Sequence, residues 1–187
     1  MKYVFIGLVL IGLYLPKENR YKSWNEEEKL TWNDFTFASK DTCSFAKDAL
    51  ISVLIKYKSF YNPKLGFSVV AVIDKKTSWT IDTISKDLLE HEQYHFDLCE
   101  LYARKIRETY DSLLKTNNTN ILKYTEVFER LDEEHFLEQS RYDVETNHGA
   151  DKSEQKMWET YIEEELMSLN TYADTLVCSN YVKVSYK

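Results

Sequence analysis

The sequence predicts an α+β fold in which a small N-terminal β-sheet packs on a long helix that further helices follow. Three observations support this class. Residues 67–73 form a continuous β-prone run, and the chain from about residue 82 to 114 has neither Gly nor Pro and repeats its apolar residues at three- and four-residue steps. The rest of the chain has mostly helical patterns. The length of 187 residues suits one domain, which we place at residues 21–187.

The N-terminus has the pattern of a secretory signal. Lys2 supplies a positive charge, and the 13 residues 3–15 form an apolar run that ends at Pro16. This run is short for a membrane-spanning helix. We therefore expect residues 1–15 to be a signal peptide or, if they are retained, an N-terminal anchor. Either case places the protein outside the cytoplasm, as a secreted, periplasmic or membrane-anchored protein whose only membrane contact is this segment.

The next part of the chain predicts a small sheet. Residues 29–35 are aromatic and short, and indicate a strand or its start. Residues 49–57 alternate apolar with polar or smaller side chains, which favours a strand, although a helix from Phe45 also fits this pattern. Residues 62–66 contain Asn, Pro and Gly and predict a turn, so the two flanking segments should form a hairpin.

The predicted long helix carries the motif HExxH at residues 91–95. A helix advances by about 100° per residue, so His91 and His95 lie one turn apart on the same face and could bind one zinc ion. Glu92 beside them could accept a proton from a water that the metal activates, which is the chemistry of metal-assisted peptide hydrolysis. The alternative is a pair of core histidines satisfied by neighbouring carboxylates.

Two more helices should follow a polar break at residues 116–120. The first has an apolar stripe that becomes ionisable toward Glu138 and Tyr142, which is consistent with a helix whose far end reaches an active site. The last helix, at about residues 152–170, should pack through Met157, Tyr161, Leu166 and Leu169.

A catalytic zinc site usually has three protein ligands and a water, so a third ligand is needed. Glu100 lies on the opposite side of the helix from His91. The candidates are His148, which precedes Gly149 and therefore a flexible backbone, and His135 and Glu138 on the preceding helix.

The chain resembles domain-of-unknown-function family 922, described as secreted zinc-dependent proteases of bacteria. The resemblance rests on the blocks at residues 32–35, 78–79, 89–105 and 142–149, the last reading Tyr-Asp-Val-Glu-Thr-Asn-His-Gly. It implies a zincin-like fold with HExxH on the active-site helix. It further implies that His91 and His95 are zinc ligands, that Glu92 is the general base and that His148 is the third ligand.

These observations predict a zinc peptidase that acts on a peptide or protein substrate. Tyr142 could donate a hydrogen bond to the oxyanion that forms when water attacks the carbonyl. The alternative is a non-catalytic, zinc-stabilised binding module on the same scaffold, but a structural site has no use for a base such as Glu92. The net charge of −7 argues against a nucleic-acid partner. The sequence does not specify an oligomeric state.

The chain has three cysteines, so it can form at most one internal disulfide. Cys99 falls on the HExxH helix and is expected to be a buried thiol. Cys43 with Cys178 is the pairing we predict.

Overall fold

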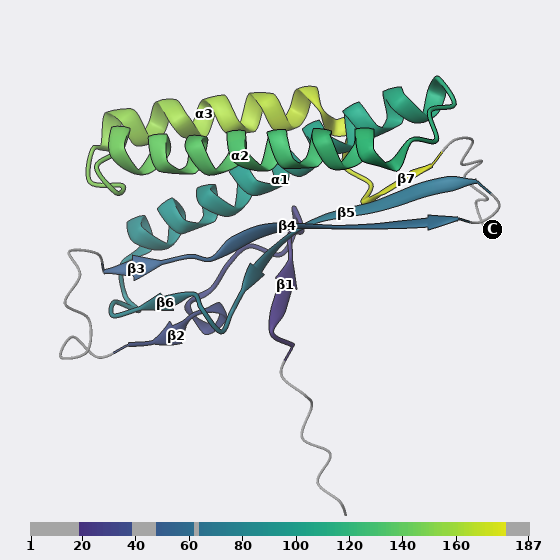
Figure 1. The fold of residues 1–187 in the computed structure, drawn as a ribbon. Helices are drawn as coiled ribbons and strands as arrows, with labels where there is room; N and C mark the ends of the chain where they lie inside the picture. The colour runs from purple at the N-terminus through teal and green to yellow at the C-terminus, as the bar shows by residue number, and fades with distance from the viewer. Residues whose placement is uncertain (1–18, 39–47, 62–63, 179–187) are drawn as a thin grey trace, which may run out of the picture.

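The computed structural model describes residues 19–38, 48–61 and 64–178 (Figure 1). They form an α+β fold in which short strands precede three helices, as the sequence predicts. The strands are β1 (Tyr21–Ser23), β2 (Thr36–Phe37), β3 (Ala49–Leu50), β4 (Val53–Tyr61), β5 (Leu65–Asp74), β6 (Trp79–Thr80) and β7 (Leu176–Cys178). The helices are α1 (Lys86–Lys115), α2 (Ile121–Glu145) and α3 (Lys152–Ser168), with 3-10 turns η1 (Trp32–Asp34) and η2 (Asn170–Tyr172).

Strand β5 is the centre of the larger sheet. It pairs with β4 as an antiparallel hairpin that runs from Val53 opposite Ile73 to Tyr61 opposite Leu65, so the predicted hairpin is confirmed. On its other edge β5 pairs with β1 near its end and with β7 near its start, both antiparallel. Alternate β5 side chains are fully buried and face the helices, which places the core between this sheet and α1: Phe67, Val69, Ala71 and Ile73.

The single strand predicted at residues 49–57 is divided in two. Ser52 causes the break, because its amide donates to the Ser78 hydroxyl at 2.9 Å and its carbonyl accepts from the Asp74 amide. As a result β3 leaves the larger sheet and joins β6 and β2 in a second, smaller sheet of order β2-β6-β3. The segment from β3 to β4 then borders the site described below.

The strand predicted at residues 29–35 is wrong for most of that segment, which turns through η1 before β2 begins. The buried Asp34 carboxylate accepts from the backbone amide of Thr31 at 3.0 Å, which closes the turn. Lys22 also donates to Asp34, at 2.9 Å. Asp34 therefore has its hydrogen-bond partners in a tight turn and not in a sheet.

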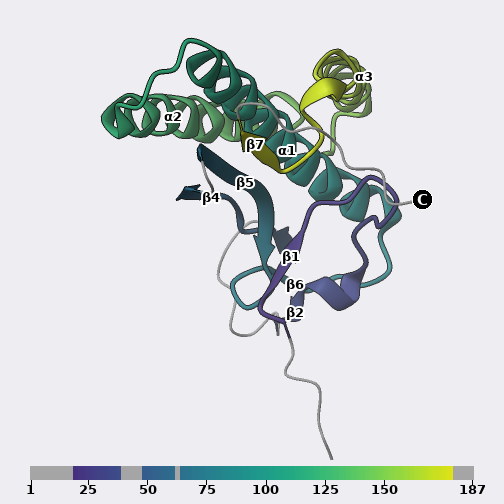
Figure 2. The same cartoon turned by 90° about the vertical axis from the view of Figure 1, so that its right-hand side faces the viewer.

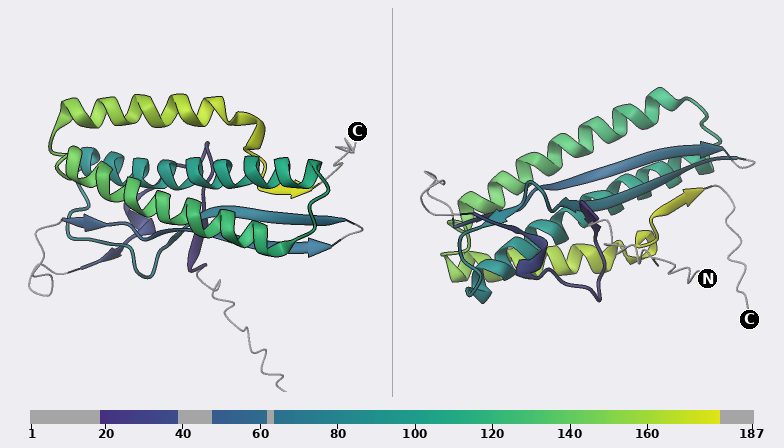
Figure 3. Two further views of the ribbon diagram at one scale, coloured as in Figure 1. Left: turned by 45° about the horizontal axis from the view of Figure 1, so that its top comes forward. Right: turned by 90° about the horizontal axis from the view of Figure 1, so that it is seen from below.

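Helix α1 lies against the larger sheet, and α2 and α3 pack on α1 (Figures 2 and 3). The N-cap of α1 is Ser85, whose hydroxyl accepts from the Leu88 amide. The buried ion pair between Arg107 and Glu100 on α1 also connects this helix to β5 and to η2. Arg107 is fully buried, donates to both oxygens of Glu100 at 2.9 Å, and also donates to the carbonyls of Val69 on β5 and Tyr172 in η2.

The predicted packing face of α3 is partly wrong. Trp158 and Ile162 are buried, whereas Met157 is 56% exposed. The buried face also contains Gln155 and Glu159, whose polarity concealed it in the sequence pattern. These polar residues are buried because Gln155 belongs to the site below, and Glu159 accepts a hydrogen bond from it.

Cys99 is fully buried, as expected. Cys178 is a free cysteine, and Cys43, its predicted partner, lies outside the described residues, as does the predicted signal segment. Among the residues that the structure describes, no helix is long and apolar enough to span a bilayer.

Candidate metal centre

The two histidines of HExxH face inward from α1 and their side chains meet. His91 and His95 are 2% and 8% exposed, and their Nε2 atoms are 3.2 Å apart. Glu92, between them in sequence, is also buried. The helix thus brings two imidazole nitrogens together, as the spacing predicts.

Asp143 on α2 completes the cluster. Its Oδ1 atom lies 3.2 Å from His91 Nε2 and 3.1 Å from His95 Nε2. The sequence argument named His148, His135 and Glu138 as candidates for the third ligand and did not single out this carboxylate. A signal was present, because His135, Gln139 and Asp143 follow one another at four-residue steps and so share one face of α2.

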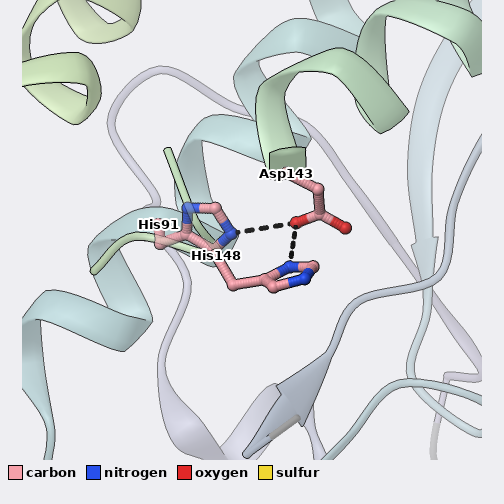
Figure 4. Close-up of side chains that lie close together, drawn as sticks. All are labelled: His91, Asp143 and His148. Carbon is pink, nitrogen blue, oxygen red and sulfur yellow. Dashed lines mark hydrogen bonds and ion pairs between the residues drawn. The ribbon is translucent and has the colours of Figure 1, made fainter. Parts of the chain in front are cut away.

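His148 reaches the same carboxylate through a left-handed turn after α2. Asn147, His148 and Gly149 all have positive φ angles, of 47°, 54° and 78°. The His148 amide donates to the Asp143 carbonyl at 2.8 Å, and its Nδ1 lies 3.0 Å from Asp143 Oδ1 (Figure 4). The imidazole is about half exposed. His91, Asp143 and His148 each offer one ligand atom within 4.8 Å of the others.

Gly149 and Tyr142 fix His91 from two sides. A Cβ atom on Gly149 would lie 3.0 Å from the Cβ and Cγ atoms of His91, so any larger residue would force this imidazole to shift by a few tenths of an ångström. The Tyr142 ring stacks on His91 with centroids 4.7 Å apart, and its hydroxyl donates to the His91 carbonyl. The sequence block at 142–149 therefore surrounds one ligand.

Two glutamines, which the sequence argument missed, determine which nitrogen of each imidazole carries the proton. Gln155 Oε1 lies 3.1 Å from His91 Nδ1, and Gln139 Oε1 lies 2.5 Å from His95 Nδ1. The amide nitrogens point elsewhere, that of Gln155 to Glu159 and that of Gln139 to the His95 carbonyl. Both amide oxygens therefore accept from Nδ1–H, which leaves the Nε2 atoms as acceptors.

This assignment leaves three acceptor atoms facing one another: two Nε2 lone pairs and one oxygen of Asp143. Such a group is stable only when a proton or a metal cation lies between its members. Zinc binds nitrogen and oxygen at about 2.0–2.2 Å in a tetrahedral arrangement, which separates its ligand atoms by about 3.3–3.6 Å. The observed 3.1–3.2 Å separations lie just below that range. The nitrogen and oxygen donors are of the types that zinc accepts.

The electrostatics of the two imidazoles differ. Burial lowers the pKa of His91, and neighbouring His95 lowers it further. Burial also lowers the pKa of His95, but the hydrogen bond to Asp143 and the nearby Glu92 carboxylate outweigh it, so the net pKa is raised. The negative surroundings that favour a positive charge on His95 also favour a divalent cation.

One family model matches the chain. It describes bacterial proteins of unknown function (DUF922), and it matches residues 29–149. The chain belongs to the DUF922 family. Neither a curated protein nor a solved structure matches the chain.

The DUF922 match contains His91, His95, Asp143 and His148, and it ends at Gly149. Gln155, which accepts from His91, lies beyond it. The region that this family describes thus contains every proposed metal-binding residue. Of the two glutamines that accept a proton from the imidazoles, Gln155 lies outside it, on α3.

The candidate ligands His91, His95, Asp143 and His148 line a cleft of about 490 Å³ in this DUF922 protein. One wall is the segment from Asp48 to Val53, and the other is the side of α2 that carries Phe136 and Asp143. Glu92 lines the same cleft, as a base acting on bound water would have to. A larger cavity, of about 1010 Å³, lies by Trp24, Gln93 and Tyr94 and contains none of the candidate ligands.

The other predicted residues occupy different positions. Tyr142 is fully buried and does not line the cleft, and its hydroxyl contacts His91 and Gln155, so an oxyanion role would require it to leave these bonds. Glu138 forms an ion pair with Arg141. His135 is buried and lies 2.8 Å from the amide nitrogen of Gln139.

Proposed function

We propose that this DUF922 protein is a zinc-dependent peptidase with a zincin-like arrangement that acts outside the cytoplasm. One observation carries the proposal. Two buried imidazoles, each with its Nδ1 proton directed to a glutamine oxygen, point their Nε2 lone pairs at one Asp143 oxygen beside Glu92 in an open cleft.

The residues that would hold the metal come from two helices and a turn. His91 and His95 supply Nε2 atoms, and His148 and Asp143 supply the further donors. Bound zinc would supply a Lewis acid that polarises a carbonyl group and lowers the pKa of water. Gln139 and Gln155 hold the imidazoles in the required tautomer, because each accepts the Nδ1 proton.

Glu92 would perform the proton transfer. Its carboxylate is buried at the cleft, one residue from His91, where it could accept a proton from the attacking water and pass it to the leaving amine. In the present arrangement Tyr142 would hold His91 in place, through ring stacking and its hydrogen bond to the His91 carbonyl. Its oxyanion role requires substrate binding to redirect the hydroxyl.

One observation favours the alternative, a non-catalytic zinc-stabilised module. Asp143 contacts His91, His95 and His148 and so brings a fourth donor to the cluster. Structural zinc sites have four protein ligands, whereas catalytic ones keep a position open. Glu92 and the cleft have no purpose in such a module. We therefore place the peptidase first.

The test separates metal binding from chemistry. Protein purified without chelator should contain about one zinc per chain. Glu92→Gln should keep that zinc and the melting temperature, while cleavage of a peptide mixture falls by a factor of about 10² or more. Glu90→Gln, an exposed change on the same helix away from this cleft, is the matched control. Full cleavage by Glu92→Gln would reject the mechanism even if the metal is bound.

The ligand set is tested by competition with a zinc chelator. His148→Ala and Asp143→Asn should each weaken zinc binding by at least about tenfold, as the loss of a ligand does. Glu138→Gln should not, because its carboxylate pairs with Arg141. Weakened binding in Glu138→Gln together with unchanged binding in His148→Ala would remove His148 from the site.

A further inference from the structure

We infer that the cleft selects peptides that carry a bulky apolar side chain next to the scissile amide. This inference rests on the proposed function. The evidence for this selectivity comes from the side chains that line the walls of the cleft, because the proposed metal-binding residues would act on every substrate.

Apolar side chains line both walls. Leu50, Ile51 and Val53 come from the segment that joins the two sheets, and Phe136 comes from α2 on the other side. Leu88, one turn before His91 on α1, also lines the cleft. A chain bound beside the His cluster would therefore lie between apolar groups from different layers of the fold.

Two of these side chains are exposed to solvent. Phe136 is 70% exposed and Leu50 is 36% exposed. Single exposed apolar residues are common and need no explanation. These two differ because they border the same cleft as His91 and Glu92 from opposite walls, so one bound side chain could cover both. A bulky apolar side chain gains free energy when it leaves water for this cleft.

A peptide series measures this selectivity. Internally quenched peptides that differ only at one central residue should be cleaved with kcat/KM at least about tenfold higher for Leu or Phe than for Ala. Phe136→Ser and Leu50→Ser should each reduce the Leu-to-Ala ratio severalfold while the zinc content stays the same. Leu137→Ser changes a 60% exposed neighbour outside the cleft and should leave the ratio unchanged. Equal rates for Leu and Ala peptides would overturn the inference and leave the peptidase intact.

A binding measurement decides the matter without turnover. Calorimetry on the zinc-loaded protein should show that 3-phenylpropanohydroxamate binds at least about tenfold more tightly than acetohydroxamate, because only the first places a ring between the walls. Phe136→Ser should reduce this difference. Equal affinities for the two hydroxamates would overturn the inference alone. If neither hydroxamate bound and no peptide were cleaved, the proposed function itself would fail, and this inference with it.

Discussion

Gly149→Ala should destabilise the protein by more than the cost of placing a side chain in a left-handed backbone conformation. Gly149 has a φ of +78°, where an L side chain is strained. The added Cβ would also lie 3.0 Å from the Cβ and Cγ atoms of His91. His91 cannot move away freely, since it is 2% exposed and Tyr142 stacks on its ring.

The two effects give the magnitude. A left-handed non-glycine residue costs about 1–2 kcal/mol, and overfilling a packed region costs about 1–3 kcal/mol more. The free energy of unfolding should therefore fall by about 2–5 kcal/mol, which lowers the melting temperature by roughly 5–15 °C for a chain of this size. Zinc affinity should fall as well, because the displaced group is a proposed ligand.

Thermal unfolding followed by circular dichroism, with EDTA present, measures the protein part of this cost. Asn117→Ala is the control, because Asn117 also has a positive φ, of 54°, but lies exposed in the α1–α2 loop. It should cost about 1 kcal/mol or less. In the double variant His91→Gly, Gly149→Ala both contact atoms of His91 are gone, so the two changes should cost at least about 1 kcal/mol less than their sum. Additive costs, or a Gly149→Ala cost equal to the control, would refute the reasoning.

The part of the site that lies on one helix could be predicted from the sequence. The angular spacing of a helix alone places His91 and His95 on one face, and no tertiary information is required. The same local rule predicted the burial of Cys99 on α1. It also predicted the β4–β5 hairpin, because the turn residues and the two β-prone runs are adjacent in the chain.

The rest depends on contacts between distant elements. Gln155 lies 64 residues after His91, and only the folded α2–α3 connection brings it to the imidazole. That connection uses left-handed conformations at Asn147 and His148, which are uncommon for residues with side chains and cannot be read from composition. The break at Ser52 was hidden for the same reason, since it depends on the Ser78 hydroxyl, 26 residues away.

Two further predictions concern groups buried in the core. Replacing Arg107 with Met should reduce the free energy of unfolding by about 3–5 kcal/mol in urea titrations, because Glu100 would keep only the hydrogen bond from Arg104, and the Val69 and Tyr172 carbonyls would lose their donor. A loss below about 1 kcal/mol would contradict this. Burial and the neighbouring His95 lower the pKa of His135 from 6.5 to about 4. Because the folded state holds this imidazole neutral, its stabilising effect is complete above the unfolded pKa and is lost as the pH falls from about 6.5 toward 4. The 2.5-unit difference corresponds to about 3 kcal/mol. With EDTA present, the loss of stability between pH 7 and pH 4 should therefore be about 3 kcal/mol smaller in His135→Phe than in the wild type, and an identical loss in both proteins would mean that His135 is not the group that titrates.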